Sequence, residues 1–375
     1  MIKINILTHN FESKNLDLFY GYWKFFFIYE KELNDLNLKI NFFFNINKKF
    51  LEADYIFINS RVFPQNNNYV DLNKLKELSE KHKNLIWFDM RDSAGTTQFE
   101  VLPFVKKYVK KQGIFKNINL YNTNLKGGRY YTNYYINKYN LKDNPEYEYS
   151  RLDLKYKNKL IIGWNVGVED YFDFINFNQY HYLKELISFK FFRKRTYSYL
   201  LKNYQNWDQD DKKEVLNIVM NSSYNRKSIA FGRNFLKKKI LETKYNKSIS
   251  NIGNLNEKRM SLKNYYKLFQ NTKITICPHG WGEIGNREFL ASKLGSAFIK
   301  PDMSYIDTWP NIYINNETYI PCDLDYSNIE NIIDELSNNK NLRKRLVDNS
   351  LSIINDINSE KGKLFFLRKV NEIIS

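Results

Sequence analysis

Apolar and polar positions along the first ninety residues follow strand and helix periods in turn. Residues 3–8 alternate and are rich in isoleucine, so they predict a strand, and residues 16–34 carry aromatic residues at helical spacing. Residues 53–59 and 84–89 predict two further strands, and residues 73–82 between them have the leucine and charge spacing of an exposed helix. Strand, helix and strand in short order favour a parallel sheet.

The middle of the chain has a weaker pattern. Residues 104–112 predict a short amphipathic helix, whereas the tyrosine-rich stretch that follows has no clean period and is predicted as loops. The interval 143–159 contains a proline, dense charge and no sustained apolar face. We therefore expect a domain boundary there, with domains at residues 1–150 and 151–375 and the last helix able to pack back on the first domain.

The second half repeats the alternation of strands and helices. Strands are expected at 160–164, 273–277 and 296–300, helices at 226–243, 286–294 and within 327–375, and an alternating segment at 312–320. The fold class expected is therefore α/β, with two facing Rossmann-like domains that have parallel sheets and a cleft between them.

Composition narrows the class of protein further. Hydrophobic residues make up 43% and charged residues 26% of the chain, which is typical of a folded globular protein. The formal net charge of +17 favours anionic partners, but many lysines stand among abundant Asn, Ile, Tyr and Phe, a composition that AT-rich coding would produce. Because the composition explains much of the charge, we expect no nucleic-acid partner. The same positive charge agrees with peripheral contact of the protein with an acidic membrane surface.

The expected location is the cytoplasm or the inner face of the membrane. Only Cys277 and Cys322 occur, too few to staple a chain of 375 residues. The amino-terminal apolar stretch is too short and broken for a signal peptide, and no segment has about 18 uninterrupted apolar residues.

Residues 274–302 contain the most informative pattern. A strand runs into the turn Cys277-Pro-His-Gly-Trp-Gly282, and a helix follows that opens with Arg287 and Glu288. In an open parallel sheet such a junction lies at the carboxyl edge, where ligands bind. The backbone N–H groups at a helix start can also hold a phosphate.

The order CP-x-G-x-G, then REFLA at the head of a helix, then LGSAFIKPD, resembles the nucleotide-sugar-binding half of GT-B glycosyltransferases. The resemblance is strongest to exostosin-like and bacterial capsular polysaccharide types. Residues 226–233, 264–273 and 320–345 fit the same pattern, so the resemblance covers about residues 226–350. It implies that residues 151–375 bind the nucleotide sugar and that residues 1–150 form the acceptor side.

This resemblance also implies a set of donor-binding residues. Glu288 would accept hydrogen bonds from ribose hydroxyls and Arg287 would neutralise phosphate, with Arg233 as a further phosphate ligand. The full set is Arg233, His279, Gly280, Gly282, Arg287 and Glu288. The implied activity moves a hexosyl or related sugar from a nucleoside diphosphate donor to a glycan or lipid-linked glycan acceptor, such as a surface polysaccharide.

A catalytic base is expected in the amino-terminal half. Inverting sugar transfer needs a group that removes the acceptor hydroxyl's proton, and Asp89 and Asp92 follow an apolar strand. Both could instead cap the turn or pair with Arg91. His9, after the first predicted strand, is a third candidate, because GT-B enzymes often recruit a base from that loop.

Two further features bear on the cleft and on metals. Trp164 and Asn165 follow a predicted strand and could stack on and hydrogen-bond a sugar, although the loop could equally shape the hinge side. Asp323-Leu-Asp325 has the DxD spelling of a metal-binding carboxylate pair but precedes a predicted helix, so it is interpreted as a helix cap. The expected reaction therefore uses no metal and no cofactor.

Two alternatives from other classes remain. A basic nucleic-acid-binding protein would use the net charge, although the sequence contains no recognised motif for it. The second alternative is a glycosyltransferase-like scaffold without activity, because the sequence does not identify one residue as the catalytic base. Phosphate-loop, nucleophile-elbow and zinc-ligand motifs are absent, which removes the usual support for nucleotide hydrolases, serine hydrolases and zinc enzymes.

Overall fold

A computed structural model describes most of the chain. The described residues are 1–9, 21–66, 69–143, 149–168, 212–218, 220, 224–248 and 260–375. The aromatic segment 169–211 and residues 16–20 of the first predicted helix lie outside them.

The amino-terminal body is built on a six-stranded parallel sheet of order β2-β1-β3-β6-β7-β9. Its strands are β1 (Ile2–Leu7), β2 (Leu38–Phe43), β3 (Tyr55–Asn59), β6 (Leu85–Asp89), β7 (Lys107–Lys110) and β9 (Leu160–Ile162). The central strands are buried along nearly their whole length, because helices and loops cover both faces of the sheet. The predicted parallel sheet is confirmed.

The helices of this body flank the sheet and its carboxyl edge. They are α1 (Tyr22–Ile28), α2 (Glu30–Asp35), α3 (Lys48–Leu51), α4 (Leu72–Lys81) and α5 (Tyr130–Tyr139), with a short hairpin of β4 (Gln65–Asn66) and β5 (Tyr69–Val70). Helix α5 occupies part of the stretch predicted as loops. Tyr131 and Tyr135 are buried one turn apart on it, so aromatic packing forms the helix face.

Two further predictions for this body are wrong. Residues 104–112 contain strand β7 instead of a helix, because the side chain of Lys110 is buried beside Asp89 and does not face solvent. Residues 160–162 form β9, which pairs with β7 at the edge of the first sheet and does not open the second.

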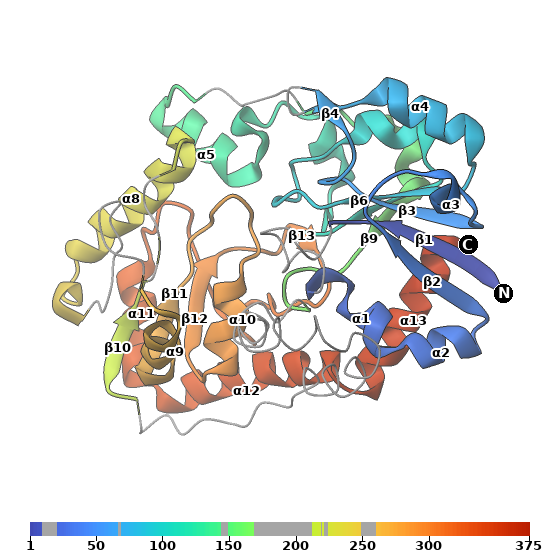
Figure 1. Ribbon diagram of the computed structural model, residues 1–375. Helices are drawn as coiled ribbons and strands as arrows, with labels where there is room; N and C mark the ends of the chain where they lie inside the picture. Colours follow the sequence, from blue (N-terminus) through green and yellow to red (C-terminus); the bar gives the residue numbers. More distant parts are fainter. Residues whose placement is uncertain are drawn as a thin grey trace.

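The carboxyl-terminal body has a four-stranded parallel sheet of order β10-β11-β12-β14. Its strands are β10 (Glu214–Asn217), β11 (Thr272–Ile276), β12 (Ala297–Pro301) and β14 (Ile320–Cys322), and its helices are α8 (Lys227–Leu241), α9 (Leu262–Asn271), α10 (Asn286–Lys293), α11 (Ile329–Asn338), α12 (Lys340–Ile357) and α13 (Glu360–Ile374). Of the predicted alternating segment 312–320, only its end enters the sheet. The predicted α/β fold with two parallel sheets is confirmed (Figure 1).

A strand pair and the last helix are among the contacts that join the bodies. Strand β8 (Ile114–Phe115) of the first body pairs antiparallel with β13 (Ile306–Asp307) of the second. Helix α12 runs beneath the second body, and α13 then lies against the first sheet near both chain ends (Figure 1). Phe366 of α13 packs 5.0 Å from Phe26 of α1, measured between ring centroids, so the last helix is part of the first body's core.

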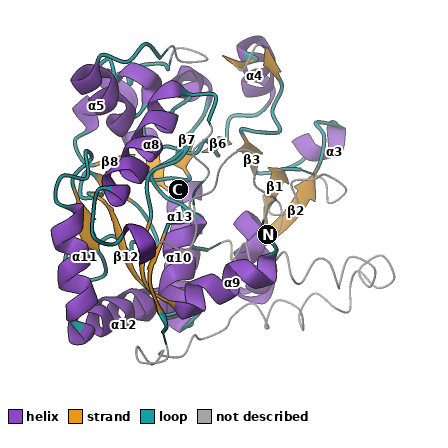
Figure 2. Cartoon of the chain, turned by 90° about the vertical axis from the view of Figure 1, so that its left-hand side faces the viewer, coloured by secondary structure: helices purple, strands orange, loops and turns teal. Residues whose placement is uncertain are grey.

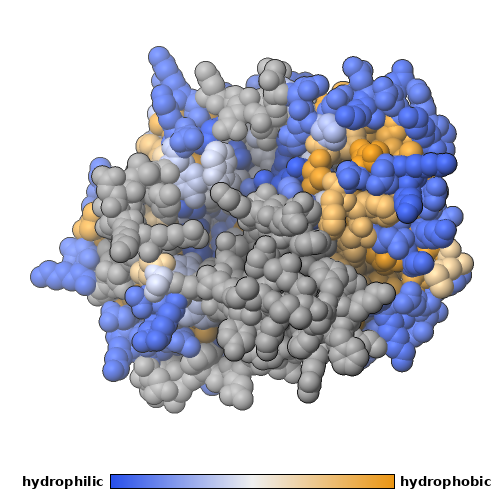
Figure 3. Space-filling model, viewed as in Figure 1, coloured by the Kyte–Doolittle hydropathy of each residue, from blue (hydrophilic) through white to orange (hydrophobic). Residues whose placement is uncertain are grey.

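The described surface in the view of Figure 3 is mainly hydrophilic, with a hydrophobic area over the amino-terminal body. In the interior, a continuous apolar cluster extends from Trp87 and Phe99 in the first body to Cys277, Phe289 and Phe298 in the second. The carboxyl edges of both sheets therefore meet through packed residues.

Candidate active site

The turn between β11 and α10 lies at the carboxyl edge of the second sheet. Cys277 continues β11 and is fully buried, and Gly285 is the residue before α10. Within the described part of the chain, no side chain caps the start of α10. The first backbone N–H groups of this helix therefore have no capping side chain, which is the usual arrangement where a helix start receives an anion.

Arg233 reaches this turn from α8. Its Nε donates to the His279 carbonyl at 2.8 Å, and its guanidinium lies 4.6 Å from the centre of the Tyr224 ring. A Cβ on Gly280 would lie 2.7 Å from Nη2 of Arg233, so glycine leaves room for the guanidinium. Burial lowers the pKa of Arg233 to about 10, and repulsion from Arg287 adds to this shift.

The head of α10 contributes Arg287 and Glu288. Nη2 of Arg287 donates to the Pro278 carbonyl at 3.2 Å, which holds the side chain against the turn. Glu288 is 1% exposed, and its Oε1 lies 2.5 Å from Nζ of Lys300 on β12. Its Oε2 is buried without a hydrogen-bond partner within the described part of the chain. Glu288 thus keeps one carboxylate oxygen able to accept from a ligand hydroxyl.

His279 is buried beside these cations. Its ring lies 4.5 Å from the Tyr131 ring of α5, and neither ring nitrogen has a hydrogen-bond partner among the described residues. Burial lowers the pKa of His279 well below its ordinary value, and Lys300 lowers it further. The imidazole is therefore neutral at neutral pH.

The amino-terminal body holds the same turn from the other side. Tyr131 donates its hydroxyl to the Gly280 carbonyl at 2.7 Å, and Nε of Arg129 donates to the Trp281 carbonyl at 2.7 Å. A Cβ on Gly282 would lie 1.3 Å from the carbonyl oxygen of Asp92, a distance that no side chain tolerates. The turn and the loop after β6 are therefore in direct backbone contact.

Glu283 joins the two bodies at this contact and was missed by sequence reasoning. Its Oε1 accepts from Oγ of Ser93 at 2.9 Å and its Oε2 from the Ala94 N–H at 3.0 Å. Burial raises the pKa of Glu283, while these hydrogen bonds lower it. Its partners lie about 190 positions away in the chain, so no local pattern could have identified it.

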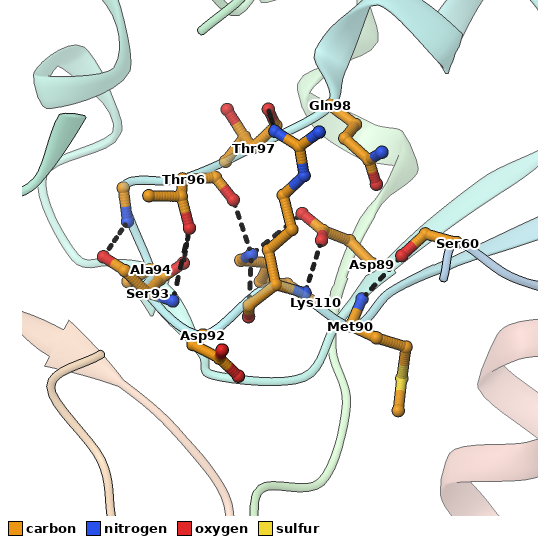
Figure 4. A network of polar contacts seen from close by, with 12 residues as sticks. Ser60, Asp89, Met90, Asp92, Ser93, Ala94, Thr96, Thr97, Gln98 and Lys110 are labelled. Carbon is orange, nitrogen blue, oxygen red and sulfur yellow. Dashed lines mark hydrogen bonds and ion pairs between the residues drawn. The ribbon is translucent and has the colours of Figure 1, made fainter. Parts of the chain in front are cut away.

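Asp89 does not suit the role of base that was expected for it. Its side chain is fully buried, 2.8 Å from Nζ of Lys110, and it accepts from the Tyr108 hydroxyl and the Arg91 N–H (Figure 4). These contacts occupy both carboxylate oxygens. Asp89 therefore fixes the loop after β6, and the expectation is corrected.

Asp92 lies outside that network. In Figure 4 its carboxylate points away from the Asp89–Lys110 pair. Its side chain is 46% exposed, and Oδ2 lies 3.0 Å from Nη2 of Arg61. It lines a cavity of about 430 Å³ between the bodies. Of the two predicted aspartates, only Asp92 lines this cavity and is partly exposed, and its role as a base stays a prediction.

His9, the third predicted base, follows β1. The register of β1, β3 and β6 places it at the same carboxyl edge as Ser60 and Met90. It is half-buried and does not line the cavity that contains Asp92. The structure thus places His9 at the carboxyl edge of the first sheet, outside the lining of this cavity, and its role as a base stays a prediction.

Trp164 and Asn165 serve packing, and the expectation that they contact a sugar is corrected. Trp164 is 1% exposed, stacks on Tyr22 at 5.0 Å between ring centroids, and donates Nε1 to the Tyr22 carbonyl at 2.7 Å. Nδ2 of Asn165 donates to Oγ1 of Thr308 and to the Pro310 carbonyl. Both side chains are buried, so neither exposes a face that could contact a sugar.

The DxD pair holds a turn instead of capping the helix start. Oδ1 of Asp325 accepts from the Ser327 N–H at 3.2 Å, and Oδ2 of Asp323 accepts from the Ser327 hydroxyl at 2.7 Å. Asp325 also pairs with Lys138 of α5 at 2.5 Å. Among the described residues, no three His, Cys, Asp or Glu side chains gather in a way that could hold a metal ion.

One cavity lies at the contact between the bodies, and a second lies within the amino-terminal body. Tyr149 lines both of them. The first, of about 430 Å³, is lined by Ser60, Arg61, Gln65, Arg91, Asp92, Thr96, Gln98, Arg129, Tyr149, Arg226 and Trp281. The second, of about 410 Å³, is formed by residues around Leu120–Gly128 together with Asp143 and Tyr149–Arg151.

Within the described residues, no helix has both the length and the apolar character needed to cross a membrane.

Comparison with known proteins gives similarity in structure only. No protein-family model matches the chain, and no curated protein matches it in sequence. Among solved structures, an alpha-glucosyltransferase in complex with UDP-glucose and DNA containing an abasic site covers 100% of both chains at 9% identity and a TM-score of 0.47. HepE of Anabaena in complex with UDP and glucose covers 99% of both chains at 8% identity and a TM-score of 0.45.

A third similar structure covers less than half of this chain. The carboxyl-terminal domain of LpcC, a group 1 family glycosyl transferase of Francisella tularensis, covers 41% of this chain and 91% of its own, at 17% identity and a TM-score of 0.27. At these identities and TM-scores, the chemistry of this chain has to be inferred from its own site.

Proposed function

We propose that this protein is a glycosyltransferase of GT-B type that transfers a sugar from a nucleoside diphosphate donor. One observation carries the proposal. The turn at residues 277–285, the uncapped start of α10 and the side chains of Arg233, Arg287 and Glu288 form one cluster at the carboxyl edge of the second sheet. This cluster faces the loop that presents Asp92.

The cluster suits a ribose and a diphosphate. Arg233 and Arg287 place two guanidiniums near the start of α10, and their mutual repulsion lowers the pKa of Arg233 beyond the effect of its burial. A bound diphosphate would relieve that repulsion and accept from the helix N–H groups. The buried Oε2 of Glu288 would accept from a ribose hydroxyl.

The proposed reaction breaks the bond between the sugar's anomeric carbon and the phosphate oxygen. The acceptor hydroxyl oxygen forms the new bond to that carbon, and in an inverting reaction its proton passes to the carboxylate of Asp92. The leaving nucleoside diphosphate keeps the electron pair, and Arg233, Arg287 and the N–H groups of α10 stabilise its charge. We propose that these groups act without a metal ion.

The acceptor side is assigned to the first body and the donor side to the second. The sequence resembles exostosin-like and capsular polysaccharide transferases. This resemblance supports a surface polysaccharide or related glycan as the acceptor. The net charge of +17 supports peripheral contact with an acidic membrane surface. That the chain has no nucleic-acid partner stays a prediction.

Nucleotide-dependent heat stability tests the proposal. One of UDP, GDP or CMP at about 100 times its Kd should stabilise the chain by about 2.7 kcal/mol and raise its Tm. Arg287→Ala should abolish the rise, whereas Arg368→Ala, an exposed position on α13, should keep it. If no nucleotide raises the Tm while duplex DNA does, the proposal is wrong and a nucleic-acid-binding function replaces it.

A further inference from the structure

We propose that Glu283 is a positioning residue for the transfer reaction: from the turn at residues 277–285, its side chain holds the loop that carries Asp92 and so sets the distance between that aspartate and the donor cluster. The inference rests on the proposed transferase function. It gives a role to a residue that belongs neither to the donor-binding set nor to the candidate bases.

Glu283 binds the two residues that directly follow Asp92. Its Oε1 accepts from the Ser93 hydroxyl at 2.9 Å, and its Oε2 accepts from the Ala94 N–H at 3.0 Å. Glu283 is 1% exposed, and Ser93 and Ala94 are fully buried. Water therefore does not compete for these hydrogen bonds, and a carboxylate acceptor makes them stronger than bonds between neutral groups. The side chain of Glu283 thus holds the backbone beside Asp92.

Gly282 places the backbone of Asp92 against the same turn. A Cβ on Gly282 would lie 1.3 Å from the Asp92 carbonyl oxygen, so this oxygen packs directly on the glycine. The Asp92 side chain is 46% exposed and lines the cavity between the bodies. Residues 92–94 therefore rest on residues 282–283 through buried contacts, while the carboxylate of Asp92 stays accessible.

Contacts within the first body keep the loop in one shape. The Ser93 N–H donates to Oγ1 of Thr96 at 3.3 Å, and the Gly95 N–H donates to Oγ of Ser93 at 3.1 Å. Nζ of Lys110 donates to the Thr96 carbonyl at 2.9 Å (Figure 4). Because these bonds fix the shape of the loop, the bonds to Glu283 act on the position of the whole loop relative to the second body.

The donor cluster has supports that do not involve Glu283. The carbonyl oxygens of residues 278, 279, 280 and 281 accept hydrogen bonds from Arg287, Arg233, Tyr131 and Arg129, in that order. Loss of the Glu283 carboxylate leaves these four bonds in place. It should therefore displace Asp92 from the donor without weakening the binding of the donor, which predicts an effect on kcat and not on the donor KM.

Steady-state kinetics of the full chain test the inference. The probe is UDP-glucose or GDP-mannose, chosen by the nucleotide that raises the Tm, with water or free glucose as the acceptor and release of the nucleoside diphosphate as the signal. Glu283→Ala should lower kcat about 10- to 100-fold, with the donor KM changed by less than about twofold, because a misplacement of about 1 Å can cost this much in rate. Glu283→Gln should recover part of kcat, since its amide oxygen can still accept from the Ala94 N–H.

A double-mutant cycle separates positioning from a general structural role. In an Asp92→Asn chain, Glu283→Ala should lower kcat by less than about a further twofold, because the carboxylate that Glu283 positions is already absent. A structural role would lower kcat by the same factor with and without Asp92. Glu335→Ala, at an exposed position on α11, is the matched control and should keep the kinetics of the wild type.

Nucleotide-dependent stabilisation of each variant shows that it is folded and that its donor site is intact. Where Glu283→Ala does not fold, Ser93→Ala takes its place in the cycle, because it removes the hydroxyl that donates to Oε1 of Glu283.

Several results would overturn the inference while the wild type still turns over the donor. These are an unchanged kcat in Glu283→Ala, equal losses with and without Asp92, no recovery in Glu283→Gln, and an unchanged kcat in Asp92→Asn. A loss confined to the donor KM would assign Glu283 to donor binding instead. If the wild-type chain releases nucleoside diphosphate from neither donor, the transferase function fails, and the inference fails with it.

Discussion

At the scale of single residues, Asp89 and Asp92 lie only three positions apart in the sequence but have different environments in the structure. Asp89 is buried and bound by Lys110, Tyr108 and a backbone N–H, so its carboxylate is committed to structure. Asp92 reaches the cavity between the bodies and pairs with Arg61 at its surface. Both follow the same apolar strand, and only the fold distinguishes them.

This difference predicts opposite effects of amide substitution. Asp92→Asn should lower kcat for sugar transfer about 100-fold or more with the donor KM nearly unchanged, since a general base contributes about 10²–10⁴ to rate. Asp71→Asn, at the cap of α4, is the matched control and should leave the kinetics unchanged. Unchanged kcat in Asp92→Asn would remove this residue as the base and favour His9.

His279 predicts a pH dependence of stability. Its folded pKa lies well below the ordinary value of 6.5, so the neutral imidazole stabilises the fold above pH 6.5. That contribution is lost as pH falls from 6.5 toward the folded pKa, because the unfolded chain takes up the proton first. Denaturant titrations at pH 7.5, 6.5 and 5.5 should show a decreasing free energy of unfolding.

The same titrations on variants isolate this residue. His279→Gln should have a shallower decrease between pH 6.5 and 5.5 than the wild type. Asn341→Gln, at an exposed position that does not titrate on α12, should keep the slope of the wild type. Equal slopes for His279→Gln and the wild type would show that His279 is not responsible.

At the scale of elements, the strand that enters the glycine turn and the helix that leaves it were predicted closely. Residues 273–277 and 286–294 correspond to β11 and α10, because a short apolar run, a turn and an amphipathic stretch are local signals. Strand β7 was predicted as a helix because the pattern counted Lys110 as exposed. Its burial depends on Asp89, 21 positions earlier, and no local period contains that contact.

Helix α5 was missed for a related reason. Its tyrosines were assigned to loops, but Tyr131 and Tyr135 pack against the second body through His279 and Phe231. Helices α5 and α8 lie side by side in both views (Figures 1 and 2). The glycine turn and the residues proposed to bind the donor were identified from local sequence patterns. Glu283, Arg129 and Tyr131, which contact this turn or its neighbouring loop from far along the chain, could not be identified in this way.

The pairing of β6 with β7 predicts a large effect of one substitution. Lys110→Met should reduce the free energy of unfolding by about 3–5 kcal/mol, because it leaves the buried carboxylate of Asp89 without its cation. Lys107→Met on the same strand, where the side chain is half-buried, is the control and should cost much less. Denaturant titration of both variants measures the difference, and equal losses would contradict the structural role of the pair.

At the scale of the whole molecule, two parallel sheets meet at their carboxyl edges, and α13 returns the chain to the first body. The arrangement places the proposed diphosphate cluster on one side of the contact and Asp92 on the other. Both bodies share one apolar cluster, so the relative position of these groups is fixed by packing. Local patterns in the amino-acid sequence predict the strands of the two sheets. They do not predict which side chains join the sheets, because those contacts link residues far apart in the chain.

The most direct test of the central claim is a crystal structure of the full chain soaked with the nucleoside diphosphate that stabilises it. The account predicts the diphosphate at the start of α10, within hydrogen-bond distance of Arg233 or Arg287, and a ribose hydroxyl at Oε2 of Glu288. A nucleotide bound away from this turn, or a turn that stays empty at saturating nucleotide, would contradict the account.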